Sequence, residues 1–326
     1  MCPRAELPAT FEDLPFTRRA ALQQGVPRRR LSADDLTHPF HGVRAHRDVD
    51  GDIHWLCRAY CERMRAGNCF SHMTAAAIRG LPLPAYATAG AAIHVASLPG
   101  RRAPEGKGII GHRLSVDAEP VSDHVHFDHR RGEMFALPVV SPRTMFAQLA
   151  AVLDPEDLVA IGDAMVGGEE PLISIPDLMQ LKNSRRGWKG RGNAVAALDQ
   201  IRAGSRSRPE SILRLQLVRA GLPEPELNRE VLDDAGVAIA RPDLLWPAFR
   251  TLIEYESDLH RVSKGKFRSD ITRFERYADA DWSSLRAHAD DVFGDPNPFV
   301  TRVARRLSSR GWEARVRLRR VHAARA

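Results

Sequence analysis

Residues 241–260 constrain the fold more than any other stretch, because acids interrupt what are otherwise two apolar strands. Asp243 precedes the first strand, a Trp246-Pro247 turn joins the two, and Glu254 and Glu256 lie in the second. Burying carboxylates in apolar surroundings is costly unless something positive lies between their oxygens. The stretch therefore predicts a hairpin whose acids surround a cation.

The alternation of side chains along the second strand predicts which face carries the acids. Successive residues of a strand point to opposite faces, so Glu254 and Glu256 share a face with Leu252. Ile253 and Tyr255 point to the other face. Hard oxygen ligands suit Mg²⁺ or Mn²⁺, so we expect one of these ions as the cofactor.

This stretch resembles the PD-(D/E)XK nuclease superfamily. Pro242-Asp243 matches the PD, and about ten residues later Glu254-Tyr255-Glu256 matches the (D/E)XK. An acid-aromatic-acid strand followed by His260 is most similar to an actinobacterial type of domain related to very-short-patch-repair endonucleases. The resemblance covers roughly residues 205–312. One departure matters, because Glu256 stands where the superfamily has lysine.

The resemblance implies metal-dependent cleavage of phosphodiester bonds, with Asp243 and Glu254 as metal ligands. Glu210, on a first helix, would hold the metal directly or through water. The family also has a helix packed over the sheet and a late strand, for which residues 280–285 are the candidate here. Glu210 has a second possible role, because Ser207 and Glu210 have the spacing of a capping box at a helix start. The two roles are geometrically compatible.

The replacement of the motif lysine by Glu256 leaves a positive charge to be supplied from elsewhere. Glu256 can act as a general base or as an extra ligand, but it cannot stabilise negative charge. Lys264, Lys266 or His260 could supply the cation. The two lysines are also candidate contacts to nucleic acid.

Residues 11–50 resemble a compact winged helix-turn-helix. Thr17 is placed to cap a first helix that Gly25 ends. A second helix is expected to follow and to end near Leu36, and residues 41–46 alternate like a wing strand.

In winged helices of this kind the second helix enters the major groove of DNA. Arg28, Arg29 and Arg30 begin that helix and are therefore candidate DNA contacts. A winged helix that docks a protein, or a solvated basic turn, explains the same residues.

Residues 68–84 strongly resemble the "SHxTAAxxxGLPxP" segment of AbiEi-type proteins of type IV toxin–antitoxin systems, in which a winged helix usually precedes it. Ser71 can cap a short helix that stops at Gly80. His72 allows a catalytic role, but we prefer a histidine at a helix start that bonds backbone groups. The resemblance implies a cognate toxin protein as a possible partner.

A small sheet is expected over residues 91–140, and one of its strands contains His124, His126, Asp128 and His129. The His-x-His-x-Asp-His spacing is the ligand signature of metallo-β-lactamases and would indicate a two-metal site. That fold also needs a glycine-rich turn after the motif, further ligands and a longer sandwich. An edge strand with a polar histidine face fits the alternation better.

Composition indicates an ordinary globular chain, with 43% hydrophobic and 27% charged residues among 326. A net charge of +7 favours a polyanionic partner such as nucleic acid; an arginine-rich surface from a GC-rich genome gives the same charge. No run reaches the roughly 20 apolar residues of a membrane span, and the N-terminus lacks a signal-peptide layout, so we expect a cytoplasmic protein without a membrane partner. The four cysteines are expected to be small buried hydrophobes rather than a zinc site or a disulfide framework.

We predict an α+β or α/β chain made of a winged helix-turn-helix-like region (10–88), a small α+β domain (89–182), a basic linker and helix (183–204), a PD-(D/E)XK-like domain (205–312) and a basic tail (313–326). The predicted function is that of a DNA-binding, metal-dependent endonuclease-like protein. The alternative is a non-catalytic antitoxin or transcriptional regulator of the AbiEi type with a degenerate nuclease domain.

Overall fold

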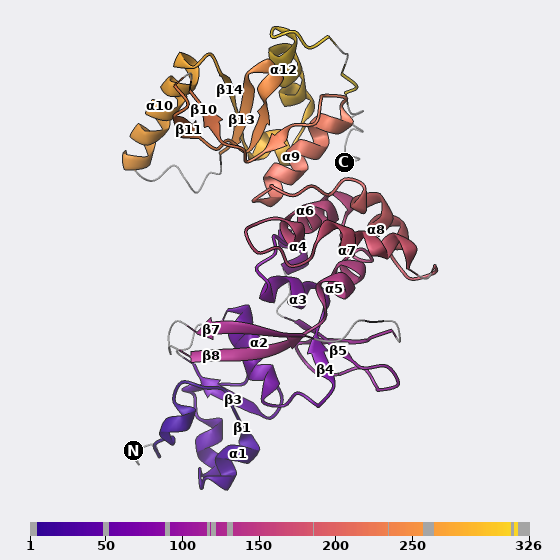
Figure 1. The fold of residues 1–326 in the computed structure, drawn as a ribbon. Helices are drawn as coiled ribbons and strands as arrows, with labels where there is room; N and C mark the ends of the chain where they lie inside the picture. The colour runs from indigo at the N-terminus through magenta and orange to yellow at the C-terminus, as the bar shows by residue number, and fades with distance from the viewer. Residues whose placement is uncertain are drawn as a thin grey trace, which may run out of the picture. The chain divides into compact units, whose positions relative to one another are not determined.

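The structure, a computed structural model, divides the chain into two compact units, each of which mixes helices and sheets (Figure 1). The first unit is Met1–Leu153 with Arg185–Arg191, and the second is Asp154–Ser184 with Gly192–Ala326. The mixed α+β class expected from the sequence is confirmed. The residues that the structure describes are 5–47, 52–88, 92–115, 118, 122–128, 133–184, 186–233, 235–256, 264–313 and 316–318.

The first unit begins with a three-stranded antiparallel sheet in the order β1-β3-β2. Thr17 caps the helix beside it, as predicted, because its Oγ1 accepts a hydrogen bond from the Ala20 amide at 3.0 Å. Gly25 follows that helix with a φ of +83°, a conformation that favours glycine. The elements of this part are η1 (Ala9–Phe11), β1 (Phe16–Thr17), α1 (Arg18–Gln23), η2 (Arg28–Ser32), β2 (Leu36–Thr37) and β3 (Val43–His46).

The expected second helix is only a five-residue 3-10 helix, η2, and strand β2 occupies the place where that helix was predicted to end. The reason lies in Ser32, Asp34 and Asp35, residue types whose side chains favour turns over a continuing helix. The prediction of a DNA-entering helix that runs to Leu36 is therefore wrong in its length.

Two parallel pairings and two antiparallel ones build the main sheet of the first unit, in the order β6-β5-β4-β8-β7. Strand β7 lies at the edge, as predicted for the histidine-rich strand. Its strands are β4 (Asn68–Phe70), β5 (Ile93–Ser97), β6 (Ile109–Arg113), β7 (Ser122–Asp128) and β8 (Glu133–Val139). Its helices are α2 (Ile53–Cys61), α3 (His72–Ile78), α4 (Ala85–Thr88) and α5 (Pro142–Leu149).

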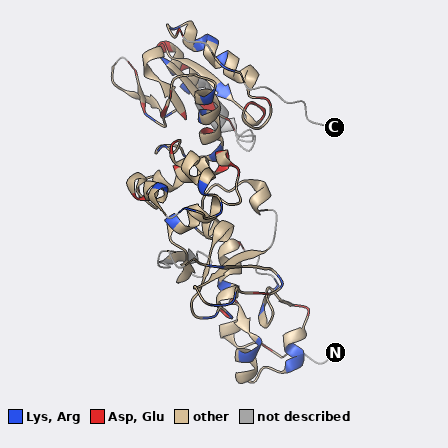
Figure 2. Cartoon of the chain, turned by 90° about the vertical axis from the view of Figure 1, so that its right-hand side faces the viewer, with Lys and Arg blue, Asp and Glu red and all other residues tan. Residues whose placement is uncertain are grey.

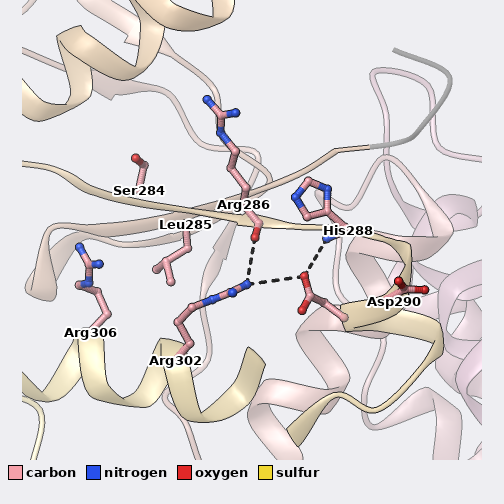
Figure 3. A pocket seen from close by; sticks show the side chains of 8 residues that line it. Ser284, Leu285, Arg286, His288, Asp290, Arg302 and Arg306 are labelled. Atoms are coloured by element: carbon pink, nitrogen blue, oxygen red, sulfur yellow. Dashed lines mark hydrogen bonds and ion pairs between the residues drawn. The ribbon is translucent and has the colours of Figure 1, made fainter. Parts of the chain in front are cut away.

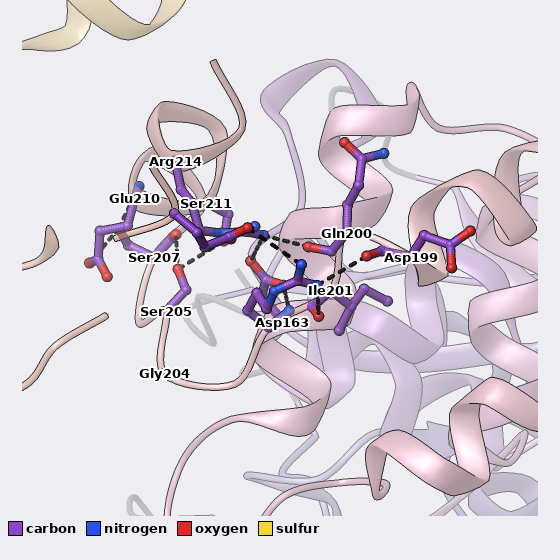
Figure 4. A network of polar contacts seen from close by, with 12 residues as sticks. Asp163, Asp199, Gln200, Ile201, Gly204, Ser205, Ser207, Glu210, Ser211 and Arg214 are labelled. Carbon is purple, nitrogen blue, oxygen red and sulfur yellow. Dashed lines mark hydrogen bonds and ion pairs between the residues drawn. The ribbon is translucent and has the colours of Figure 1, made fainter. Parts of the chain in front are cut away.

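Helices α6 and α9 of the second unit are joined by a buried ion pair (Figure 4). Arg214 Nη2 lies 3.0 Å from Asp163 Oδ2, and both side chains are at most 1% exposed. Arg214 also donates to the Gln200 carbonyl and to Glu224, so the guanidinium ties the middle of α9 to α6 and to the segments around Gln200 and Glu224. The helices of this part are α6 (Pro155–Val166), α7 (Ile175–Met179), η3 (Gln180–Asn183), α8 (Arg191–Leu198) and α9 (Arg208–Arg219).

The rest of the second unit is a four-stranded sheet in the order β14-β13-β12-β9, in which only β13 and β14 are parallel. The strands are β9 (Glu226–Leu227), β12 (Leu244–Trp246), β13 (Thr251–Tyr255) and β14 (Ser283–Ala287). The remaining elements are a separate hairpin of β10 (Val231–Leu232) with β11 (Ala238–Ala240), the 3-10 turn η4 (Pro247–Phe249), and helices α10 (Lys264–Asp279), α11 (Ala289–Phe293) and α12 (Asn297–Ser308).

Both faces of this sheet are covered by helices. Leu244 and Ile253 point to one face and pack with residues of α9 and α12. Leu245 and Leu252 point to the other face and pack with Tyr277 of α10. The sheet is therefore the middle layer, with α9 and α12 on one face and α10 on the other. In the part of the chain that the structure describes, no helix combines the length and apolarity that crossing a membrane needs.

Candidate active site

The hairpin of β12 and β13 brings Asp243 and Glu254 to the sheet face that α10 covers. The predicted alternation is confirmed, because Leu252 belongs to the core under α10 whereas Ile253 belongs to the opposite core. Asp243 lies just before β12, and its Oδ2 accepts a hydrogen bond from the Tyr255 amide at 2.6 Å. This bond ties the first acid to the strand that carries the second.

Glu254 is held by two side chains of α10. Arg273 Nη2 lies 2.8 Å from Glu254 Oε2, and the Tyr277 hydroxyl donates to Glu254 Oε1 at 3.0 Å. Burial and the neighbouring Glu254 raise the pKa of Tyr277 well above its usual range, so the phenol keeps the proton that it donates.

Glu210 takes the capping-box position at the start of α9 and is only 5% exposed. Its amide bonds Ser207 Oγ at 3.4 Å, and its carboxylate accepts hydrogen bonds from the Ser207 hydroxyl, the Arg206 amide and Asn228 Nδ2 (Figure 4 shows the Ser207 contacts). Asn228 has a φ of +48°, which Asn tolerates better than most residues. The side-chain amide of Asn228 also donates to the Gly204 carbonyl. Asn228 therefore links Glu210 to the segment that precedes α9.

The other two acids influence the pKa of Asp243. Burial, and then repulsion by Glu210 and Glu254, raise the pKa of Asp243 to about 7, although the Tyr255 amide and Arg273 oppose the shift. A carboxyl group in this state is held protonated near neutral pH unless a cation approaches. The three acids do not, however, form a group whose ligand atoms all lie within 4.8 Å of one another among the described residues.

Glu256 is paired with Arg286 of β14, whose Nε lies 3.0 Å from Glu256 Oε1. The Arg286 guanidinium also lies 3.9 Å above the centre of the Phe274 ring. Of the three residues expected to supply a cation, His260 lies outside the described residues, and only the backbone of Lys264 and Lys266 is described, in the first turn of α10.

The cation that the sequence analysis missed is Arg273. The signal that could have found it is its spacing, because Arg273 stands four residues before Tyr277, and residues with this separation share one face of a helix. Phe274 and Tyr277 of α10 pack with Leu245 and Leu252, so a residue one turn before Tyr277 is expected over the strand that carries Glu254.

A pocket of about 550 Å³ lies between β14, α11 and α12, and its lining includes three arginines and a histidine (Figure 3). Arg302 donates to the Arg286 carbonyl and lies 3.6 Å from Asp291, and the His288 amide donates to the same carboxylate. Arg306 donates to the Ser283 hydroxyl. The arginines are thus oriented by their neighbours, and Arg302 stays about half exposed.

Arg28 and Arg29 of η2 are exposed, but Arg30 is buried and is not kept as a candidate DNA contact. Its two terminal nitrogens bond both oxygens of Asp35 at 2.8 and 2.7 Å, and its Nε donates to the Ala5 carbonyl. All three nitrogens of the Arg30 guanidinium therefore donate hydrogen bonds within the protein.

Other arginines gather near Arg28. A hollow of about 710 Å³ beside α1 is lined by Arg18, Arg19, Arg28 and Arg63, together with His41 and uncharged residues. Lysines and arginines recur along the described part of the chain, at α1 and η2 and again along α12 (Figure 2).

His124 and His126 of β7 stack on His54 of α2. The centre of the His54 ring lies 3.8 Å from that of His126 and 6.5 Å from that of His124. They belong to no group with metal-ligand geometry among the residues that the structure covers. The Asp128 side chain and His129 lie outside the described residues.

Comparison of the chain with protein-family models, with curated proteins and with solved structures gives no match.

Proposed function

We propose that the second unit is a metal-dependent endonuclease-like domain that cleaves phosphodiester bonds in DNA. The observation that carries the proposal is that the buried Asp243, just before β12, interacts electrostatically with Glu210 of α9 and Glu254 of β13. Burial, and then repulsion by Glu210 and Glu254, raise the pKa of Asp243 to about 7, and a divalent cation would relieve both effects.

The order of the elements supports the same proposal. An acid on a first helix is followed by the two acidic strands, by α10 packed over the sheet and by the late strand β14. The PD-(D/E)XK resemblance implies this order.

The donors fit a hard cation, because all three are carboxylates. When bound, Mg²⁺ or Mn²⁺ would polarise the phosphate and lower the pKa of the attacking water. Asp243 and Glu254 are the direct ligands in this proposal. Glu210 acts through water, because its oxygens already accept three hydrogen bonds from Ser207, Arg206 and Asn228.

Arg273 fills the role of the missing motif lysine in this proposal. Its guanidinium lies beside Glu254 and lowers the pKa of Asp243, so it can stabilise negative charge that develops on a phosphate. Glu256 then has no catalytic part, because Arg286 neutralises it.

A non-catalytic DNA-binding regulator, with Arg28 and Arg29 at the DNA, is the second candidate, and one observation favours it. Glu254 and Glu210 are already bonded by protein groups, as in a site that has lost its metal. A cognate toxin would be the partner in that case, in line with the AbiEi resemblance.

A plasmid-cleavage assay separates the two candidates. Supercoiled DNA is incubated with the full chain and Mg²⁺, Mn²⁺, Ca²⁺ or EDTA, and Glu254→Ala is compared with the exposed control Glu275→Ala. The nuclease proposal expects nicking with Mg²⁺ or Mn²⁺ that Glu254→Ala abolishes and Glu275→Ala keeps. Equal nicking by both variants, or no nicking by the wild type with any metal, overturns it.

A further inference from the structure

Three histidines that are far apart in the sequence meet in the first unit. His72 begins α3, His94 lies in β5 and His112 lies in β6. His94 Nδ1 is 2.9 Å from His112 Nε2, and the His72 ring centre is 3.7 Å from that of His112 and 5.5 Å from that of His94. Among the described residues, they form the one group of three or more possible ligands whose ligand atoms all lie within 4.8 Å of one another.

Regular elements fix two of the rings. Strands β5 and β6 are parallel, with His94 opposite Ile110 and Ala96 opposite His112. His94 and His112 are therefore diagonal neighbours on one face of the sheet. The Thr74 hydroxyl, one turn into α3, accepts a hydrogen bond from the His94 amide at 2.8 Å and joins the helix to this strand.

The backbone at His72 is held in an unusual conformation, with a φ of +50°. This costs energy for a residue with a Cβ and needs support from the surroundings. The support comes from Gln148 of α5, whose Oε1 accepts a hydrogen bond from the His72 amide at 3.0 Å. Ser71, predicted to cap α3, makes no cap bond; its hydroxyl lies 3.1 Å from His72 Nδ1 instead and leaves Nε2 for another partner.

The charge state of the group suits a metal. Burial, and then the neighbouring imidazoles, lower the pKa of His72 to about 3 and that of His94 to about 4. Burial also lowers the pKa of His112. At neutral pH all three rings are neutral, which is the form that binds metal ions.

We propose that His72, His94 and His112 bind one zinc ion, with a water molecule or a small anion as the fourth ligand. Imidazole nitrogens select zinc and related transition metals over Mg²⁺ and Mn²⁺. Structural zinc sites have four protein ligands, whereas catalytic sites have three and leave the fourth position to water or substrate. Three histidines match the second kind. Each ring is only partly buried, so a fourth ligand can reach the ion from solvent.

This site is independent of the acids of the second unit. Its ligands are nitrogens rather than oxygens, and none of them belongs to the proposed nuclease site. The two proposals can therefore fail separately, and Glu254→Ala is expected to keep zinc binding.

The test uses the metal-free full chain titrated with Zn²⁺ by calorimetry. One zinc per chain is expected. His94→Ala and His112→Gln should each weaken binding by more than about 100-fold, because changes outside the ligand shell alone cost about 10- to 100-fold. His124→Ala, in the edge strand of the same sheet, is the matched control and should bind like the wild type.

X-ray absorption of the zinc-loaded wild type tests the ligands without any variant and covers the case in which a variant fails to fold. Nitrogen and oxygen neighbours with the imidazole signature, and no sulfur, are expected. A sulfur neighbour would assign the metal to a cysteine, such as Cys57, Cys61 or Cys69, the free thiols among the described residues. That result, the absence of a stoichiometric zinc, or binding that survives both histidine variants overturns the proposal.

Discussion

Arg273 of α10 and Glu254 of β13 form an ion pair, with 2.8 Å between Nη2 and Oε2. The pair joins the helix that covers the sheet to the strand that carries the acids. Because the same guanidinium lowers the pKa of Asp243, one arginine affects two of the three proposed metal-site acids.

Replacing Arg273 by glutamine should therefore lower metal-dependent DNA cleavage by about 10²- to 10³-fold, the usual effect of removing one charge-stabilising donor. The measurement is the rate constant of plasmid nicking under single-turnover conditions at saturating Mn²⁺. Arg276→Gln is the matched control, because Arg276 is on the same helix and donates to the Ala238 carbonyl. Equal loss in both variants would point to damage to α10 rather than to the site.

Asp243→Asn should stabilise the second unit at neutral pH. An unfolded chain releases the Asp243 proton at a pH of about 4, whereas the folded chain holds it up to about 7. The free energy of unfolding of the wild type therefore falls as the pH rises from about 4 to 7. The variant does not lose this stability, because asparagine stays neutral.

The gain should be small at pH 5 and grow to about 1–3 kcal/mol at pH 8, as measured by urea unfolding in metal-free buffer. The control is the exposed Asp279→Asn, for which no pH-dependent gain is expected. A gain that is equal at both pH values would contradict the raised pKa of Asp243.

Asp163→Ala should destabilise the second unit by about 3–5 kcal/mol, because it removes the buried carboxylate beside Arg214 and leaves only the more exposed Glu224 as an ionic partner. Both side chains of this pair are at most 1% exposed. Calorimetric unfolding measures the loss. Arg229→Ala removes an ion pair with Glu226 in the same unit, but Arg229 is 66% exposed, so its effect should stay within about 0.5 kcal/mol.

Replacing Arg28 and Arg29 together by alanine should weaken duplex-DNA binding and make it less salt-dependent. Each lost phosphate contact lowers the slope of log K against log salt by about 0.9, so a reduction of up to about 1.8 is expected from fluorescence anisotropy. The control is Arg102→Ala, which is 82% exposed and paired with Glu105. An unchanged slope would remove η2 from the DNA-binding surface.

The sequence predicted those features that depend on neighbouring residues. The alternation of Leu252 and Ile253 across β13 is set by the two-residue repeat of a strand, and the cap at Thr17 by a short-range hydrogen bond. The edge position of β7 was predicted from its alternating polar face. These predictions agree with the structure, because nothing distant competes with them.

Contacts between distant elements could not be predicted in this way. Arg30 looked like a DNA contact because its burial depends on the Ala5 carbonyl, 25 residues away, as well as on the turn that brings Asp35 to it. The three histidines share no spacing signature, since one lies at a helix start and two lie in parallel strands. Only the register of β5 with β6 places His94 beside His112.

The measurement that tests the proposed nuclease site most directly is calorimetric titration of the full chain with Mn²⁺. It is made in the His112→Gln background, so that the histidine group does not contribute, and at pH 8, above the pKa of Asp243. We predict one Mn²⁺ per chain, lost in Asp243→Asn and kept in Asp279→Asn. No binding by the parent chain, or binding that survives Asp243→Asn, would contradict the proposal that these acids form a metal site.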